Sequence, residues 1–361
     1  MWQRVRPWLA VDAPLALCIT LLLAAGLVTL YSAALDFPGR FELQLRNILI
    51  AIGLMWAVAN VPPQQLQRYA AGVYAVGVLM LLAVFVAGIS RKGSQRWINL
   101  GFEFQPSELM KIAMPLMLAW FFHQFRTTQR WKTFSVAAVL LLIPVALIAR
   151  QPDLGTALLV LAAGFYVILF AGLSWKALAA LAAAAVVSVP IAWPFLHDYQ
   201  RQRVMTMLDP GADPMGKGFQ ITQAGIAIGS GGLSGKGWLE GTQGHLGFVP
   251  ERSTDFIFSV FAEEFGLLGI CALLLLYFLL IARGLQITAR ADTQFARLLA
   301  GSITMIFFTY VFVNIGMVSG IVPVVGVPLP FISYGGTALM TLGLGCGILM
   351  SIQRQSRQRL I

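Results

Sequence analysis

The sequence predicts an all-α polytopic membrane protein, with ten transmembrane helices forming one membrane-embedded domain over residues 1–361. Hydrophobic residues make up 58% of the chain and charged residues only 11%, and the mean hydropathy is +0.79. These values lie far from those of soluble globular proteins. Apolar runs of about 18 residues or more recur along the chain, and each is long enough to cross a bilayer. No linker or soluble segment is long enough to fold alone.

The cysteines and the first apolar run fit this class. Cys18, Cys271 and Cys346 all lie inside apolar runs, so no disulfide framework is expected. The three histidines are scattered and form no zinc-binding pattern. The first apolar run follows Arg4 and Arg6 and is too long for a signal-peptide core, so we expect an uncleaved span.

The distribution of charge predicts the topology. An even number of spans places both termini on one side, where the loops hold thirteen Lys and Arg residues but only two acids, Asp12 and Asp292. Basic residues in short loops mark the cytoplasmic side, so both termini are expected there, and the net charge of +10 indicates membrane topology rather than nucleic-acid binding. The expected spans are residues 14–34, 45–61, 70–89, 107–123, 134–149, 154–172, 177–196, 256–283, 298–318 and 335–352.

The outer loops differ in length. Residues 90–105 form a polar loop, whereas residues 197–255 form one long extracytoplasmic loop between helices 7 and 8, with a short interfacial helix expected at 221–228. The glycine-rich run within it is not a Walker A loop, because Ser230 and Gly237 occupy positions that need Gly and Ser or Thr. Backbone approach to a sugar or diphosphate and a flexible turn both remain open interpretations.

Acids begin three outward helices, at Glu108, Asp153 and Asp255. An acid in a first turn is an ordinary helix cap, so a structural role is a strong alternative for each. Their shared interface favours function, as does Lys111, which lies inside a span and three residues from Glu108 on one helical face. We expect such a cluster to bind a charged headgroup, or a Mg²⁺ or Mn²⁺ ion that bridges carboxylate and phosphate.

Two further pairs are candidates for substrate binding. Arg203 and Arg201 could hold a phosphate bidentately, although together with Tyr199 they also fit an interfacial anchor. Trp97 beside Arg96 could stack on a sugar ring, although an aromatic-belt position is the common explanation.

Seven blocks in order resemble the SEDS family of bacterial polytopic proteins, which act in shape, elongation, division and sporulation. The resemblance covers essentially the whole chain and is greatest to the elongation member, through the YQRQRV block and the short cytoplasmic tails. The blocks are 92–98 (KGSQRWI), 105–111 (QPSELMK), 151–156 (QPDLGT), 199–204 (YQRQRV), 229–238 (GSGGLSGKGW), 250–256 (PERSTDF) and 330–336 (PFISYGG).

The resemblance implies a peptidoglycan glycosyltransferase that polymerises lipid II into β-1,4-linked glycan strands in the bacterial cytoplasmic membrane, with its active site on the extracytoplasmic face. It also implies a class B penicillin-binding protein of the elongation complex as partner, and no organic cofactor. Asp255 matches the residue that the family marks as essential. The expected substrate-binding residues are Lys111, Arg203, Glu108, Asp153, Arg96, Trp97, Lys236 and Ser333, and the possible metal ligands are Asp255, Glu108 and Asp153.

The chemistry of lipid II requires little acid–base machinery. Diphosphate leaves readily when cations neutralise it, so one carboxylate acting as general base suffices. We expect Asp255 to deprotonate the acceptor hydroxyl or to hold a cation, while Lys111 and Arg203 stabilise the diphosphate. A helix cap would lower the pKa of Asp255, which makes metal ligation a serious second role.

Two other functions compete with this one, namely a lipid II flippase and a non-catalytic scaffold for a partner synthase. A flippase needs polar groups in both leaflets, whereas the acids of this chain are expected almost entirely on the outer side. The sequence therefore favours the polymerase.

Overall fold

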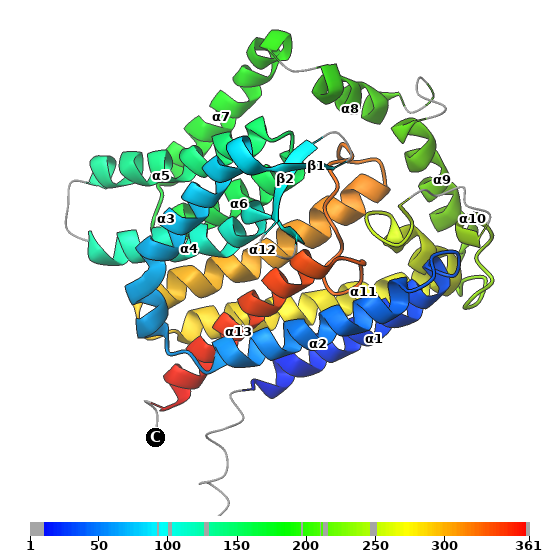
Figure 1. Cartoon of the computed structure of the whole chain (residues 1–361), viewed down its shortest axis with the longest axis horizontal. Helices are drawn as coiled ribbons and strands as arrows, with labels where there is room; N and C mark the ends of the chain where they lie inside the picture. The colour runs from blue at the N-terminus through cyan, green and yellow to red at the C-terminus, as the bar shows by residue number, and fades with distance from the viewer. Residues whose placement is uncertain are drawn as a thin grey trace, which may run out of the picture.

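The computed structural model describes residues 11–91, 94–99, 103–125, 130–195, 198–209, 211, 216–245 and 251–358. Ten long helices correspond to the ten expected spans (Figure 1). They are α1 (Ala13–Ala33), α2 (Arg40–Ala59), α3 (Pro63–Ala87), α4 (Pro106–Gln124), α5 (Arg130–Arg150), α6 (Leu154–Phe170), α7 (Trp175–Ala192), α11 (Ile257–Arg290), α12 (Gln294–Val318) and α13 (Gly336–Gln358).

The fold is that of a polytopic helical membrane protein. Among the described residues, seven of these helices have the length and hydropathy to cross a membrane, and α6 and α7 contain shorter apolar helices. The remaining long helix, α4, carries Glu108 and Lys111 near its start. The count of ten spans and the cytoplasmic location of both termini remain predictions.

Several helix starts follow directly from local sequence. Asp12, Asp153 and Thr293 each stand before a helix and accept a hydrogen bond from the backbone N–H three residues later, at 3.1–3.2 Å. Pro63 and Pro106 open α3 and α4, where the missing N–H costs nothing.

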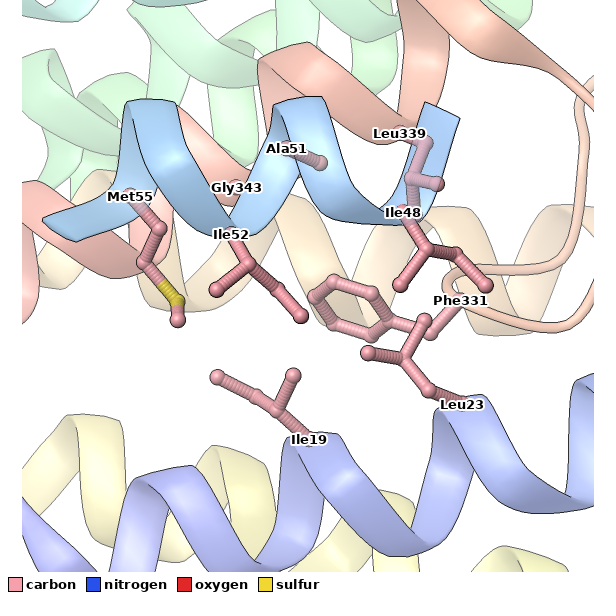
Figure 2. Close-up of a pocket in the computed structure, with 9 residues that line it drawn as sticks. All are labelled: Ile19, Leu23, Ile48, Ala51, Ile52, Met55, Phe331, Leu339 and Gly343. Carbon is pink, nitrogen blue, oxygen red and sulfur yellow. The ribbon is translucent and has the colours of Figure 1, made fainter. Parts of the chain in front are cut away.

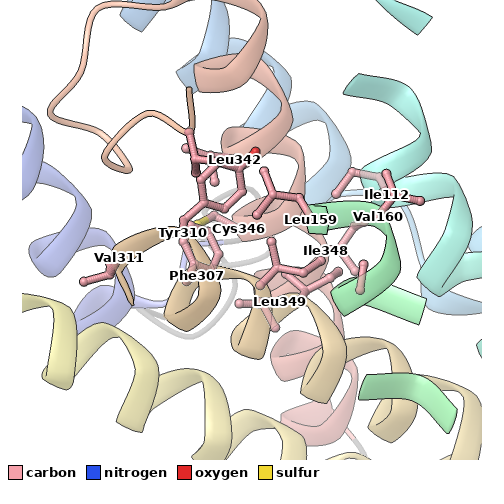
Figure 3. Packing of buried hydrophobic residues seen from close by; sticks show 14 of the residues in the cluster. Ile112, Leu159, Val160, Phe307, Tyr310, Val311, Leu342, Cys346, Ile348 and Leu349 are labelled. Atoms are coloured by element: carbon pink, nitrogen blue, oxygen red, sulfur yellow. The ribbon is translucent and has the colours of Figure 1, made fainter. Parts of the chain in front are cut away.

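The two most buried spans, α12 and α13, form the centre of the bundle. In the most apolar 18-residue stretch of each helix, 78% of α12 and 72% of α13 is buried, against 22–39% for the other five candidate spans. Figure 3 shows side chains of α4, α6, α12 and α13 meeting there, including Ile112, Leu159, Phe307 and Cys346. The outer helices leave large apolar side chains exposed, as helices that face lipid do.

Two glycines bring α13 against α2. A Cβ atom added to Gly343 would lie 2.8 Å from the carbonyl oxygen of Ala51, and one added to Gly347 would lie 2.5 Å from that of Met55. The four-residue spacing puts both glycines on one face, which is the small-residue packing typical of membrane helices. Next to this contact lies an apolar crevice between α1 and α2, bordered by Phe331 (Figure 2). Its wholly apolar lining does not suit a charged headgroup.

Helix α11 is interrupted at Gly266, whose φ of 61° and ψ of −163° are not helical. Residues 231–237, which we call the insert loop, fill the interruption. The N–H groups of Leu267 and Leu268 donate to carbonyls of the insert loop at 2.9 and 3.1 Å, and the insert loop donates in turn to the carbonyls of Glu263 and Glu264 at 3.0 and 3.1 Å. The glycine-rich run therefore completes a broken helix, a role that neither interpretation of the sequence includes.

Both polar loops contain more regular structure than the sequence predicts. Strands β1 (Ile89–Arg91), β2 (Ser94–Asn99) and β3 (Glu103–Phe104) form antiparallel pairs in the order β1-β2-β3 where only a polar loop was expected. The described part of the long loop includes three α-helices, and the helix predicted at 221–228 lies within the second of these. They are α8 (Asp198–Leu208), α9 (Lys217–Ser230) and α10 (Thr242–His245). A short 3-10 helix, Trp193–Phe195, follows α7 at the end of the expected span 177–196.

Candidate active site

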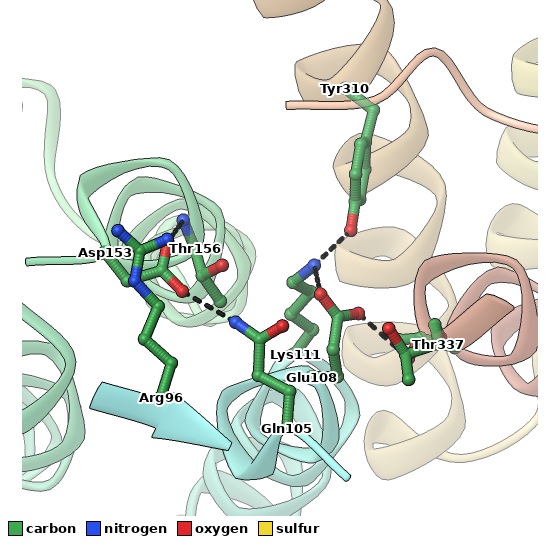
Figure 4. A network of polar contacts seen from close by, with 9 residues as sticks. Arg96, Gln105, Glu108, Lys111, Asp153, Thr156, Tyr310 and Thr337 are labelled. Atoms are coloured by element: carbon green, nitrogen blue, oxygen red, sulfur yellow. Dashed lines mark hydrogen bonds and ion pairs between the residues drawn. The ribbon is translucent and has the colours of Figure 1, made fainter. Parts of the chain in front are cut away.

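The start of α4 holds a buried ion pair. Lys111 Nζ lies 2.6 Å from Glu108 Oε1, as their spacing predicts. The same ammonium donates to the hydroxyl of Tyr310 on α12 at 2.6 Å, and Thr341 Oγ1 of α13 donates to Glu108 Oε2 at 3.2 Å. Figure 4 shows Lys111 between Glu108 and Tyr310. Since all four side chains are buried, this network fixes α4 to both central helices.

Asp153 connects the start of α6 to the start of α4. Its Oδ1 accepts from the backbone N–H of Thr156, which confirms the predicted cap, and its Oδ2 accepts from Gln105 Nε2 at 2.7 Å. Arg96 on β2 lies 3.6 Å from Asp153 Oδ1 and donates to the carbonyls of the two preceding residues (Figure 4). Because Gln105 directly precedes α4, the 105–111 and 151–156 blocks form one polar assembly.

Asp255 lies before α11, and the prediction that it lies in the first turn of that helix is wrong. Helix α11 begins at Ile257, and its N-cap residue, Phe256, makes no side-chain capping bond. The Asp255 side chain is half-buried. A Cβ atom built on Gly326 would lie 3.3 Å from Asp255 Oδ2, so the carboxylate lies against the connection between α12 and α13.

Tertiary contacts explain why the helix starts late. The carbonyl groups of residues 253, 254 and 255 accept, in order, from Tyr334 N at 2.9 Å, Ser333 Oγ at 2.6 Å and Asn314 Nδ2 at 2.9 Å. Ser333 Oγ also accepts from the N–H of Leu329 at 2.8 Å. The segment before α11 is thus held by the 320–335 connection and by α12. Ser333 donates to the carbonyl of Thr254, which directly precedes Asp255 in the chain.

Helix α12 joins the two groups. Tyr310 and Asn314 are four residues apart and share one face, so the helix that contacts Lys111 also contacts the backbone of Asp255. A Cβ atom on Gly155, in the first turn of α6, would lie 2.5 Å from the carbonyl oxygen of Val325. The helix start capped by Asp153 therefore packs on the same connection that Asp255 faces.

The other expected substrate residues lie in different surroundings. Lys236 Nζ is 2.7 Å from Glu263 Oε1 and 2.8 Å from Thr242 Oγ1, so it anchors the end of the insert loop. Arg203 is half-buried on α8, which lies at the edge of the molecule, away from α4 (Figure 1). Trp97 is half-buried on β2, opposite Ile89. Their roles toward substrate remain predictions.

Four residues of this region escape the sequence-based prediction, namely Gln105, Tyr310, Asn314 and Thr341. Polar side chains inside an apolar span are a usable signal, because they need partners there. Tyr310 and Asn314 carry that signal, and their four-residue spacing places them on one face.

The three expected metal ligands do not converge. In the described part of the chain, no three His, Cys, Asp or Glu side chains come together in a way that could hold a metal ion. Glu108 is paired with Lys111, and Asp153 with Gln105 and Arg96. A cation held by Asp255, with phosphate oxygens and water as its other ligands, remains a prediction.

Comparison with known proteins finds similarity along the whole chain. A family model described as "Cell cycle protein", for FtsW, RodA and SpoVE, matches residues 13–358. Peptidoglycan glycosyltransferase MrdB of Escherichia coli (strain K12) is 49% identical over 353 residues, which cover 97% of this chain and 94% of that protein. MrdB of Helicobacter pylori (strain J99) is 36% identical over 361 residues, covering 96% and 91%.

Solved structures share the fold. A chain of a peptidoglycan synthase complex superposes with a TM-score of 0.84 at 33% identity, covering 97% of this chain and all of that one. The crystal structure of the Thermus thermophilus rod shape determining protein RodA gives a TM-score of 0.73 at 31% identity, covering 96% and 98%.

Proposed function

This chain belongs to the FtsW, RodA and SpoVE family of cell cycle proteins and is a peptidoglycan glycosyltransferase of the elongation type, and we propose that it polymerises lipid II at Asp255. The substrate is a disaccharide-pentapeptide linked to undecaprenyl diphosphate. A sugar hydroxyl forms a new bond to the anomeric carbon of a lipid-linked sugar, and the bond from that carbon to the diphosphate breaks. The α linkage thereby becomes a β-1,4 linkage.

The observation that carries this proposal is the half-buried Asp255 carboxylate, which lies before α11 on a backbone held by Asn314 and faces the connection between α12 and α13. In this proposal the carboxylate takes the proton of the attacking hydroxyl, while the electron pair of the broken bond leaves on the diphosphate.

The cations near the helix starts stabilise the leaving group in this proposal. An ammonium has three N–H donors, and Glu108 and Tyr310 engage two of those on Lys111. We assign the third, together with the charge of Arg96, to the diphosphate oxygens. Arg203 lies on α8, away from α4 (Figure 1), so it is not assigned to this anion. Arg203, Lys236, Trp97 and Ser333 keep their expected roles in substrate binding as predictions.

The partner and the location follow from the same premise. The fold similarity to a chain of a peptidoglycan synthase complex supports a class B penicillin-binding protein as the partner that supplies transpeptidase activity. The charge asymmetry of the loops supports an inner-membrane protein whose site opens on the extracytoplasmic face.

The test is polymerisation of labelled lipid II by the purified protein with its partner. Asp255→Asn keeps the size of the side chain and removes the base, so we expect the rate to fall about 10²–10⁴-fold. Asp209→Asn serves as the matched control, because this exposed carboxylate accepts from the N–H of Gly211 within a loop. Near-normal glycan formation by folded Asp255→Asn would remove Asp255 from the chemistry.

The same assay separates the other possibilities. Full activity with Glu108, Lys111 and Asp255 all neutralised would indicate a scaffold, and lipid movement across vesicles without glycan formation would indicate a flippase. Addition of EDTA tests the cation: loss of activity that Mg²⁺ or Mn²⁺ restores supports a metal at Asp255, and an unchanged rate removes it.

A further inference from the structure

Asn314 is a completely buried amide within an apolar span, with 0% of its surface exposed. A polar side chain in such a place is costly unless its hydrogen bonds are made. Its Nδ2 donates to the carbonyl oxygen of Asp255 at 2.9 Å and to that of Val327 at 2.7 Å. One side chain therefore joins the segment before α11 to the connection before α13.

These two bonds fix both sides of the Asp255 carboxylate. Val327 directly follows Gly326, the residue whose backbone lies against Asp255 Oδ2. If the amide were turned over, its oxygen would face two carbonyl oxygens, so the neighbours determine its orientation. Asn314 Oδ1 has no hydrogen-bond partner among the described residues. The side chain is thus placed for its two donors, at the expense of its acceptor.

The rest of α12 gives Asn314 a firm base. The helix is the most buried of the candidate spans in the described part of the chain, and Tyr310, one turn earlier, bonds to Lys111. Displacement of the Asn314 amide would therefore release two backbone segments from a helix that is otherwise held in place.

We propose that Asn314 is a positioning residue that sets the Asp255 carboxylate for proton transfer, an inference that rests on the proposed function. Without its two donors, the backbone at Asp255 separates from the Gly326–Val327 backbone, and the base moves from its place beside the attacking hydroxyl. A misplacement of about 1 Å at such a site can cost about 10²-fold in rate.

The experiment compares two variants at Asn314 with one control on the same helix. Asn314→Leu removes both donors at similar volume, and Asn314→Asp keeps the shape but places oxygen toward the two carbonyls. Ser302→Ala is the control, because Ser302 is also buried on α12 and donates to the carbonyl of Ala163 at 2.7 Å, in contact with α6. It removes one buried hydrogen bond from the same helix without contacting the Asp255 segment.

For both Asn314 variants we expect kcat for lipid II polymerisation to fall about 10²-fold with KM changed less than about twofold, the signature of a misplaced catalytic group. The acidic limb of the pH–rate profile should also move, whereas Ser302→Ala should lower thermal stability and leave kcat and the profile unchanged. Asn314→Asp provides the measurement if Asn314→Leu does not fold.

Wild-type kcat and an unmoved pH profile in either folded Asn314 variant would overturn the inference, as would equal losses in Ser302→Ala. The activity of Asp255→Asn distinguishes failure of this inference from failure of the proposed function. If Asp255→Asn is inactive and the Asn314 variants are normal, only this inference fails, whereas an active Asp255→Asn removes the proposed function first.

Discussion

The Lys111 network shows how one buried charge is made tolerable. A lysine that is 2% exposed needs both an opposite charge and hydrogen-bond acceptors, and Glu108 and Tyr310 supply them at 2.6 Å each. Thr341 then donates to the second oxygen of Glu108. Because α4, α12 and α13 each contribute, the complete network can form only when the three helices are packed together.

Breaking this pair from one side should cost more than removing both charges. We expect Lys111→Met to lower the free energy of unfolding by about 3–5 kcal/mol, because it leaves the Glu108 carboxylate buried without its counter-ion. The double variant Glu108→Gln with Lys111→Met should recover part of that loss. Thermal unfolding in detergent measures both, and a double variant less stable than Lys111→Met would contradict this account.

At the scale of elements, α11 is built from two helical segments and a loop from elsewhere in the chain. A Cβ atom on Gly266 would lie 2.3 Å from the backbone nitrogen of Gly235, and the φ of 61° also disfavours any other residue. The insert loop reaches the helix backbone only because both positions lack side chains. Lys236 then holds the loop end to Glu263.

Replacement of Gly266 by alanine should therefore strongly destabilise the protein. We expect Gly266→Ala to destabilise the protein by at least about 1–3 kcal/mol, through strain at positive φ and the clash with Gly235. Gly229→Ala is the matched control, since an added Cβ meets nothing within 4 Å and the residue is helical, so it should be neutral or slightly stabilising. Equal melting temperatures for the two variants would show that the break is not under this constraint.

The sequence could predict the helices of this molecule but not the contacts that adjust their ends. Apolar runs identify the long helices because hydrophobic length is a local property. Ser253, Thr254 and Asp255 have the composition of a helix cap, yet their carbonyls bond to Tyr334, Ser333 and Asn314, which are 59 to 81 residues distant. Such competition from remote partners delays α11 to Ile257 and is invisible in the local pattern.

The same limit applies to the candidate site, where contacts within one helix could be predicted and contacts between helices could not. The Glu108–Lys111 pair lies within one helix, so spacing alone predicts its contact. Gln105 and Asn314 act across helices, and no periodicity shows which partner each will meet. The three strands within residues 89–104 were not predicted, because each is short and pairs with its neighbours inside a polar segment.

For the whole molecule, charged contacts join α1 to the later helices at both ends. At one end, Asp12 before α1 accepts from Arg283 at 2.6 and 2.9 Å and lies 3.5 Å from Arg357. At the other end, Arg252 donates to the carbonyl of Ala33 at 3.0 Å and pairs with Asp36. The helix is thus held at the start and the finish of its span.

The Asp12 contacts make stability depend on pH in acid. Burial raises the pKa of Asp12, but hydrogen bonds from Arg283 and the Leu15 N–H, and the charges of Arg283 and Arg357, outweigh it and hold the pKa below its usual 3.8. The stability that the ionised Asp12 carboxylate contributes is complete above pH 3.8 and is lost as the pH falls through the lowered pKa.

We expect Asp12→Asn, which still caps the helix, to lower the free energy of unfolding at neutral pH by about 1.5–3 kcal/mol, the contribution of charged hydrogen bonds. The difference from wild type should shrink as pH falls below 3.8. Unfolding followed by tryptophan fluorescence across this range measures it, and a difference that stays constant with pH would assign the stabilisation to packing.

The interruption of α11 has a consequence for biosynthesis. Residues 267–290 alone form a helix of about 36 Å, enough to cross about 30 Å of hydrocarbon. The insert loop is synthesised before this span, but it can dock only after the span has formed. We therefore expect the newly made chain to pass through an inactive precursor, which matures when the insert loop closes the gap in the helix that follows Asp255.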